Sequence, residues 1–159
     1  MKKREWVLVA SVAAILIVGG SVFIWRNGQP RRESLAVVVK LSSALTGSRG
    51  SELLDAVLLP DAIRDKTVAE QQGFLTKVLT DEISPEGVRN LRQHAEFGPL
   101  KSIFPDEAGG WCATAGVLAV DCVAFKMERA GIRAEVVLVR EGTTYRVVRC
   151  NNVKQMAGA

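Results

Sequence analysis

Histidine, tyrosine and aromatic residues in general are scarce in this sequence. Its 159 residues include one His and one Tyr, and Phe, Trp and Tyr together make up 6%. Imidazole is the commonest metal ligand and the most frequent general base, so the chain offers little for either role. We expect the lone His94 to be a solvated side chain near the end of a helix. The sequence therefore predicts no metal site and no cofactor.

Net positive charge is also missing from most of the chain. The formal charge is +4, but residues 1–32 carry six basic and one acidic side chains, whereas residues 33–159 carry 15 basic and 16 acidic ones. A nucleic-acid-binding domain concentrates positive charge on its folded part, so we exclude nucleic acid as a partner. There is likewise no glycine-rich phosphate loop after a strand, and no CxxC, HExxH or GxSxG motif.

The longest hydrophobic run covers residues 6–25 and contains no ionisable side chain. At about 1.5 Å per helical residue it matches the ~30 Å hydrocarbon core of a bilayer. Trp6 and Trp25 stand at its two ends, where indole rings favour the membrane interface. A cleaved signal peptide is the alternative, but its apolar part is normally about 7–15 residues and ends in a small-residue cleavage site, which this run lacks. We predict a retained single-pass helix embedded in the lipid bilayer.

Polar segments around this run define the predicted organisation of the chain. We predict a basic tail over residues 1–5, the transmembrane helix over 6–25, a linker over 26–33, a folded domain over 34–154 and a C-terminal tail over 155–159. Basic residues flank the helix on both sides, so the positive-inside rule hardly distinguishes the two membrane orientations. A short charged N-terminal tail before a first apolar helix usually stays on the cytoplasmic side of the membrane. We therefore expect an inner-membrane protein whose C-terminal domain is extracytoplasmic.

Helix start and stop signals fill the first half of the domain. They include Ser34 and Ser51 as caps, a capping box at Thr67 and Glu70, and Ser84 followed by a proline in a first helical turn. Each signal precedes apolar residues at helical spacing. The sequence predicts four short helices, over residues 34–47, 51–59, 67–79 and 84–95.

The spacing of the apolar residues changes at about Trp111, where apolar and polar residues begin to alternate as in strands. We predict strands over residues 111–115, 117–127, 132–140 and 144–150, joined by hairpin turns. Pairing Glu128 with Gly131, and Arg140 with Thr143, gives one apolar face and one mixed, more polar face. The predicted fold is therefore α+β, with short helices packed on the apolar face of a curved antiparallel sheet. The predicted apolar face comprises Val123, Phe125, Met127, Ile132, Val136, Leu138, Tyr145 and Val147.

The order of these elements resembles that of the NTF2-like, or cystatin-like, α+β roll. The resemblance covers about residues 34–154, where early helices ending in LLPDAIRDKTVAEQQGFLTKVL are followed by a further helix and a run of hairpins. This fold hosts enzymes, ligand binders and assembly modules. Membrane-anchored bacterial examples often serve as extracytoplasmic domains of larger assemblies. The domain is nearly neutral and has no catalytic constellation, and the single apolar helix carries several small residues. We therefore predict a non-catalytic accessory or assembly subunit whose partners are other subunits of a membrane complex.

Asp121 is the carboxylate that suggests a different function. In the register above it falls on the apolar face, in the row of Leu138 and Tyr145. NTF2-like isomerases line a pocket with a carboxylate as general base and a phenol that polarises a carbonyl. The resemblance therefore implies, as the alternative, a small apolar-ligand-binding or isomerase-like domain that uses Asp121 and Tyr145. The structural interpretation, which we favour, is an Asp121 at the rim, bound to a backbone amide or to an arginine such as Arg149.

The three cysteines permit two interpretations. In an exported domain, Cys112 and Cys122 are candidates for a disulfide across adjacent strands. Buried thiols that behave as small hydrophobic side chains are the alternative. Cys150 lies too far from Cys122 in the predicted register to pair with it.

Residues 97–105 form a predicted loop that is unusually rich in large apolar side chains. They either pack over the sheet or form a surface that contacts a partner protein. Self-association through the open sheet edge or the anchor helix would give a homo-oligomer. The candidates for the partner contact are Phe97, Leu100, Ile103, Phe104 and the following Trp111.

Overall fold

The computed structural model describes residues 28–158. The chain divides after Arg32 into two compact units, and the second, which begins at Glu33, is the α+β domain. The predicted transmembrane helix over 6–25, with Trp6 and Trp25, lies outside the described residues. Within residues 28–158, no helix is both long enough and apolar enough to cross a bilayer. The membrane anchor therefore stays a prediction.

The first described helix covers residues 28–46. The predicted linker is helical over residues 28–33, so the helix does not begin at Ser34. Ser34 is not a cap but a fully buried residue within the helix.

The next four helices are α2 (Gly50–Ala56), α3 (Asp61–Arg64), α4 (Val68–Thr80) and α5 (Pro85–His94). Two of them, α4 and α5, begin where their capping residues predict. Before α4, the Thr67 hydroxyl accepts from the Glu70 amide at 3.4 Å, and the Glu70 carboxylate accepts from the Thr67 amide at 3.0 Å. Before α5, the Ser84 hydroxyl accepts from the Gly87 amide at 3.0 Å. The capping predictions at Thr67 and Ser84 are confirmed. The predicted cap at Ser51 is wrong, because Arg49 precedes α2 without a side-chain cap and Ser51 lies within the helix. The single turn of α3 was not predicted.

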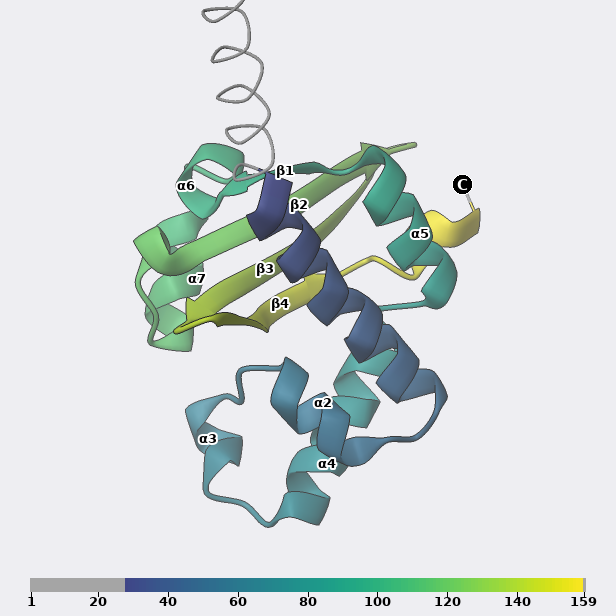
Figure 1. Cartoon of the computed structure of the whole chain (residues 1–159), viewed down its shortest axis with the longest axis vertical. Coiled ribbons are helices and arrows are strands. Elements are labelled where there is room, and N and C mark those ends of the chain that lie inside the picture. The colour runs from purple at the N-terminus through teal and green to yellow at the C-terminus, as the bar shows by residue number, and fades with distance from the viewer. Residues whose placement is uncertain (1–27, 159) are drawn as a thin grey trace, which may run out of the picture. The chain divides into compact units, whose positions relative to one another are not determined.

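The sheet has four antiparallel strands in the order β1-β2-β3-β4 (Figure 1). They are β1 (Glu96–Pro99), β2 (Cys122–Arg129), β3 (Ile132–Glu141) and β4 (Thr144–Asn151). The two predicted hairpins are confirmed, but Arg129 pairs with Ile132, a shift of two from the predicted register. Because side chains alternate with period two, this shift leaves the side chains of β2 and β3 on their predicted faces.

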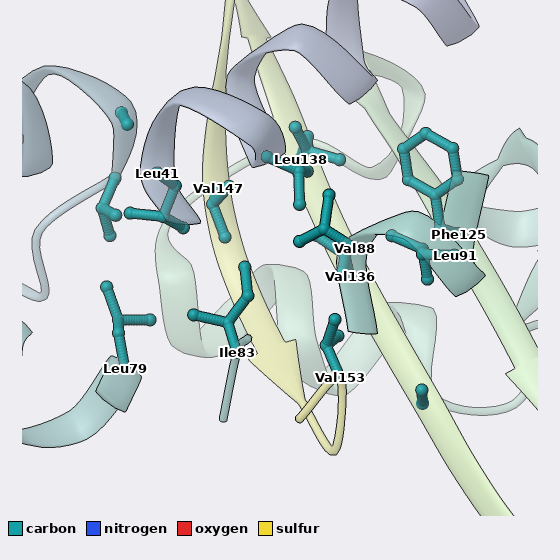
Figure 2. Close-up of a cluster of buried hydrophobic side chains, with 14 of the residues drawn as sticks. Leu41, Leu79, Ile83, Val88, Leu91, Phe125, Val136, Leu138, Val147 and Val153 are labelled. Atoms are coloured by element: carbon teal, nitrogen blue, oxygen red, sulfur yellow. The ribbon is translucent and has the colours of Figure 1, made fainter. Parts of the chain in front are cut away.

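One face of the sheet packs against the helix over residues 33–46 and helices α2, α4 and α5, as predicted. Figure 2 shows this first core, in which Leu41 and Leu91 from the helices meet Phe125, Val136 and Leu138 from the strands. All five side chains are fully buried. Burial of this apolar layer is the main stabilisation of the fold, at about 1.5–3 kcal/mol for each large side chain.

The other face of the sheet carries a second core, which was not predicted. Helices α6 (Leu100–Ile103) and α7 (Ala108–Ala115) cover it, so the sheet lies between two helical layers. The predicted strand over 111–115 is wrong, because its few alternating residues belong to the alanine-rich α7, which ends where Gly116 adopts a left-handed φ of 67°. The core comprises Leu100, Ile103, Phe104, Ala108 and Cys112 from the helical layer and Cys122, Ala124, Val137 and Val139 from the sheet.

Residues 155–158, which belong to the predicted tail over 155–159, are part of the domain. Val153 and Met156 are buried in the first core, and residues Gln155–Gly158 form a turn of 3-10 helix. The Asn90 side-chain amide of α5 donates to the Met156 carbonyl at 2.9 Å. A Cβ atom on Gly87 would lie 1.4 Å from the Val153 carbonyl oxygen, so α5 and the C-terminal segment touch backbone to backbone.

Candidate functional site

The structure does not bring Asp121 and Tyr145 together in a pocket. Asp121 ends a short 3-10 helix (η1, Ala119–Asp121) and is exposed, because pairing with β3 begins only at Cys122. Tyr145 is buried in the first core. The predicted position of Asp121 on the apolar face is therefore wrong.

The segment 97–105 is mostly core and not a surface loop. Leu100, Ile103 and Phe104 are buried in the second core, and the half-buried Phe97 ring lies 4.7 Å from the ring of Phe125. These four candidates for a partner contact are thus engaged inside the domain, in agreement with the packed alternative. Trp111 differs, because its half-buried indole packs edge-on against Phe104 at 5.0 Å and also lines a surface groove.

The three cysteines are unpaired thiols in the structure. Cys112 lies on α7 and not on a strand, yet it does share the second core with Cys122, whose thiol donates to the Leu118 carbonyl at 3.3 Å. Burial, together with the neighbouring Cys112, raises the pKa of the Cys122 thiol to about 12. Cys150 lies on the opposite face, in the first core. The structure therefore agrees with the second interpretation, in which the thiols are unpaired and pack as small hydrophobic side chains.

A β-bulge in β4 decides which way Arg149 points. Leu138 pairs with Val147 but its neighbour Val137 pairs with Arg149, so Val148 has no partner on β3. Strict alternation would direct Arg149 toward the first core. The extra residue resets the alternation, as bulges do, and Val148 and Arg149 both face the second helical layer.

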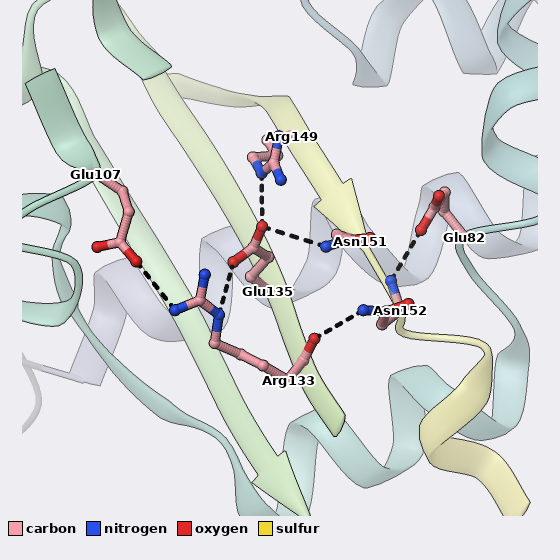
Figure 3. Close-up of polar contacts among 7 residues, drawn as sticks. All are labelled: Glu82, Glu107, Arg133, Glu135, Arg149, Asn151 and Asn152. Atoms are coloured by element: carbon pink, nitrogen blue, oxygen red, sulfur yellow. Dashed lines mark hydrogen bonds and ion pairs between the residues drawn. The ribbon is translucent and has the colours of Figure 1, made fainter. Parts of the chain in front are cut away.

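Arg149 meets a carboxylate there that is itself fully buried, Glu135 of β3 (Figure 3). The Arg149 Nε donates to Glu135 Oε1 at 2.6 Å, and the Asn151 amide donates to the same oxygen at 3.4 Å. Arg133 Nε lies 3.4 Å from Glu135 Oε2. Arg133 also reaches Glu107, which precedes α7, at 3.0 Å. A buried carboxylate needs such partners, and these bind β3, β4 and α7 together.

The Arg149 guanidinium is fixed on two sides and open on a third. Its Nε is held by Glu135, and its Cζ lies 4.8 Å from the ring centroid of Trp111, a cation–π contact. Its two terminal nitrogens make no hydrogen bond with any residue in the described part of the chain. The side chain keeps 41% of its surface exposed. Arg149 is therefore a preorganised cation with free donors.

Arg149 lines a groove of about 240 Å³ between the segment after α2 and helix α7. The Leu58 amide donates to the Val147 carbonyl at 2.9 Å, which fixes this segment to the edge of β4. We call this site the Arg149 groove. Its lining comprises Leu58, Leu59, Pro60 and Asp61 from the first segment, Trp111, Thr114 and Ala115 from α7, and Val148 and Arg149 from β4.

Three other depressions are larger, and none of them is lined by Arg149 or Arg133, the ion-pair partners of the buried Glu135. One, of about 530 Å³, lies between the first described helix and α5 and is lined mainly by hydroxyl and apolar side chains with Arg89 and Arg92. A second, of about 640 Å³, is a polar surface around the exposed His94, and a third, of about 290 Å³, lies beside Lys40 and Asp55. Among the described residues no cluster of His, Cys, Asp and Glu side chains could hold a metal ion. The Arg149 groove is thus the strongest candidate site.

Sequence reasoning missed this site except for Trp111. The bulge at Val148 has no glycine or proline signal, so alternation alone misplaced Arg149. A signal for Glu135 was present, however. It precedes Val136, Val137, Leu138 and Val139, and such an unbroken apolar run is typical of a strand buried on both faces.

Comparison of this chain with models of known families, with curated proteins and with solved structures finds no match.

Proposed function

We propose that this chain is a bitopic membrane protein whose exported domain, of the NTF2-like type, is a non-catalytic accessory or assembly subunit of a larger membrane complex. In this proposal residues 6–25 anchor the domain, and the Arg149 groove contacts another subunit. The observation that carries it is the cation–π contact of Arg149 with Trp111 at the wall of an apolar groove. Arg and Trp are among the residue types most enriched at the energetic centres of protein interfaces.

The size of the groove favours contact with a protein over the alternative of a bound small molecule. Pockets for drug-sized ligands are typically about 300–1,000 Å³, whereas this groove is about 240 Å³. The isomerase-like alternative also needs Asp121 and Tyr145 in one pocket, and the structure separates an exposed Asp121 from a buried Tyr145.

The test is native-size analysis of the full chain, extracted from its own membrane in mild detergent, with identification of every co-migrating protein. We expect a discrete complex with stoichiometric partners. Arg149→Gln should release most of the chain from it. Arg146→Gln is the matched control, because Arg146 is also on β4, is 40% exposed and binds one carboxylate, Glu141, through its Nε.

Two results would contradict the proposal. A wild-type chain that migrates alone as a monomer would exclude a stable accessory subunit, and one that migrates as a dimer would indicate self-association instead. A complex that survives Arg149→Gln as well as Arg146→Gln would place the contact outside the Arg149 groove.

A further inference from the structure

We infer that the Arg149 groove receives the C-terminal residue of a partner chain, with its free carboxylate on the terminal nitrogens of Arg149 and its apolar side chain between Pro60 and Trp111. This inference rests on the proposed function, in which the groove contacts another protein. It adds the chemical class of the docked segment and the residue that recognises it.

The first argument is the geometry of the free donors. Glu135 holds the Nε of Arg149 at 2.6 Å, and the guanidinium lies over the ring of Trp111. The remaining edge, with both terminal nitrogens, matches the two oxygens of a carboxylate in a bidentate pair. Because the buried Glu135 fixes the cation in advance, binding an anion requires little further ordering of this side chain.

The second argument is charge. Among the residues that line the groove, only Asp61 and Arg149 are charged. Asp61 already pairs with Arg64 at 3.0 Å, and its side chain is 86% exposed. Glu135 is fully buried and uses Oε1 on Arg149. The groove therefore offers a ligand one fixed cation whose terminal donors are free, beside apolar walls.

The third argument is size. An apolar cavity of about 150 Å³ holds a molecule such as benzene, and the groove of about 240 Å³ has room for one large apolar side chain and a carboxylate. An internal Asp or Glu of a passing chain would bring backbone on both sides into the same space. A chain terminus brings it on one side only, and it combines the carboxylate with an adjacent apolar side chain.

The test compares short peptides that differ only in their terminal group. The probes are acetyl-Ser-Ala-Val-Leu with a free carboxylate and the same peptide with a terminal amide, together with pairs that end in Val or Phe. They are titrated into the full chain in non-ionic detergent, and the indole N–H signal of Trp111 is followed by NMR, assigned with Trp111→Phe. Net hydrogen bonding to a charged group predicts that at least one acid binds roughly 10- to 100-fold more tightly than its amide.

Variants identify the source of that preference. Arg149→Gln should abolish the difference between acid and amide, whereas Arg146→Gln should retain it. Equal binding of acid and amide, no shift of the Trp111 signal with any probe, or an acid preference that survives Arg149→Gln would each overturn the inference.

Two further probes test whether the groove binds another kind of ligand instead of a chain terminus. Acetyl-leucine that binds as tightly as the tetrapeptide acid would make this a site for a free small acid. An amidated peptide with an internal Glu that binds equally well would make it a site for an acidic side chain. Either result overturns the inference.

The outcomes also distinguish this inference from the proposed function. A membrane complex that Arg149→Gln disrupts, without any preference for the free carboxylate, would keep the function and refute the inference. Carboxylate preference in a wild-type chain that is a monomer in its membrane would refute the function alone.

Discussion

The buried carboxylate of Glu135 gives the sharpest prediction about stability. Glu135→Gln keeps the size of the side chain but removes the charge that holds Arg149 and Arg133. Removing one partner of a buried ion pair typically costs about 3–5 kcal/mol. Here the two arginine side chains are 41% and 43% exposed, so water can solvate both after the change. We therefore expect a loss of about 1–3 kcal/mol in the free energy of unfolding.

The matched control is Glu141→Gln on the same strand. The Glu141 carboxylate also binds one arginine, Arg146 at 3.0 Å, but it is 46% exposed, and exposed pairs contribute about 0–1 kcal/mol. The assay is urea unfolding of the full chain in non-ionic detergent, followed by circular dichroism at low and high salt. The effect of Glu135→Gln should be nearly independent of salt, since buried pairs are screened little. Equal losses for the two variants would refute the structural role of Glu135.

Three further predictions concern the packing of the domain. Gly87→Ala should destabilise by about 1–3 kcal/mol, because its Cβ meets the Val153 carbonyl at 1.4 Å; a stabilised variant in urea unfolding would contradict the docked C-terminus. Gly73→Ala should instead stabilise by about 0.4–1 kcal/mol, since a Cβ there has open space in α4, and a loss of stability would contradict that packing. Burial raises the pKa of the Cys150 thiol from 9.0 to about 12, so the folded state keeps a proton that the unfolded state loses. Stability should therefore fall as pH rises from 9 toward 12, by up to about 1.4 kcal/mol per pH unit, and Cys150→Ala should reduce the slope; an unchanged slope would contradict a raised pKa.

Local signals in the sequence predicted the elements that depend on neighbouring residues. The Thr67 capping box, the Ser84 cap and the two hairpins depend on residues within a few positions of each other, and the structure confirms them. The apolar face of the sheet was also predicted, because a register shift of two preserves alternation.

The missed features depend on contacts between distant residues. Helix α7 is short and contains two glycines, and it is stable because Cys112 and Phe104 pack on the far face of the sheet. The ion pair between Glu135 and Arg149 requires the bulge at Val148. No residue type at this position predicts a bulge. The candidate site lies where these features meet, so the sequence predicted the first core far better than the groove.

Site-specific photo-crosslinking in intact cells tests the central claim most directly. A photoreactive p-benzoyl-phenylalanine replaces either Thr114, an exposed residue that lines the Arg149 groove, or Thr76, an exposed threonine on α4 that does not. The adducts are then mapped by mass spectrometry. We expect a specific adduct at Thr114 that maps to the last residues of another membrane-complex subunit, and none at Thr76. Equal adducts at both positions, or an adduct at Thr114 confined to an internal segment of the partner, would contradict a groove that receives a chain terminus.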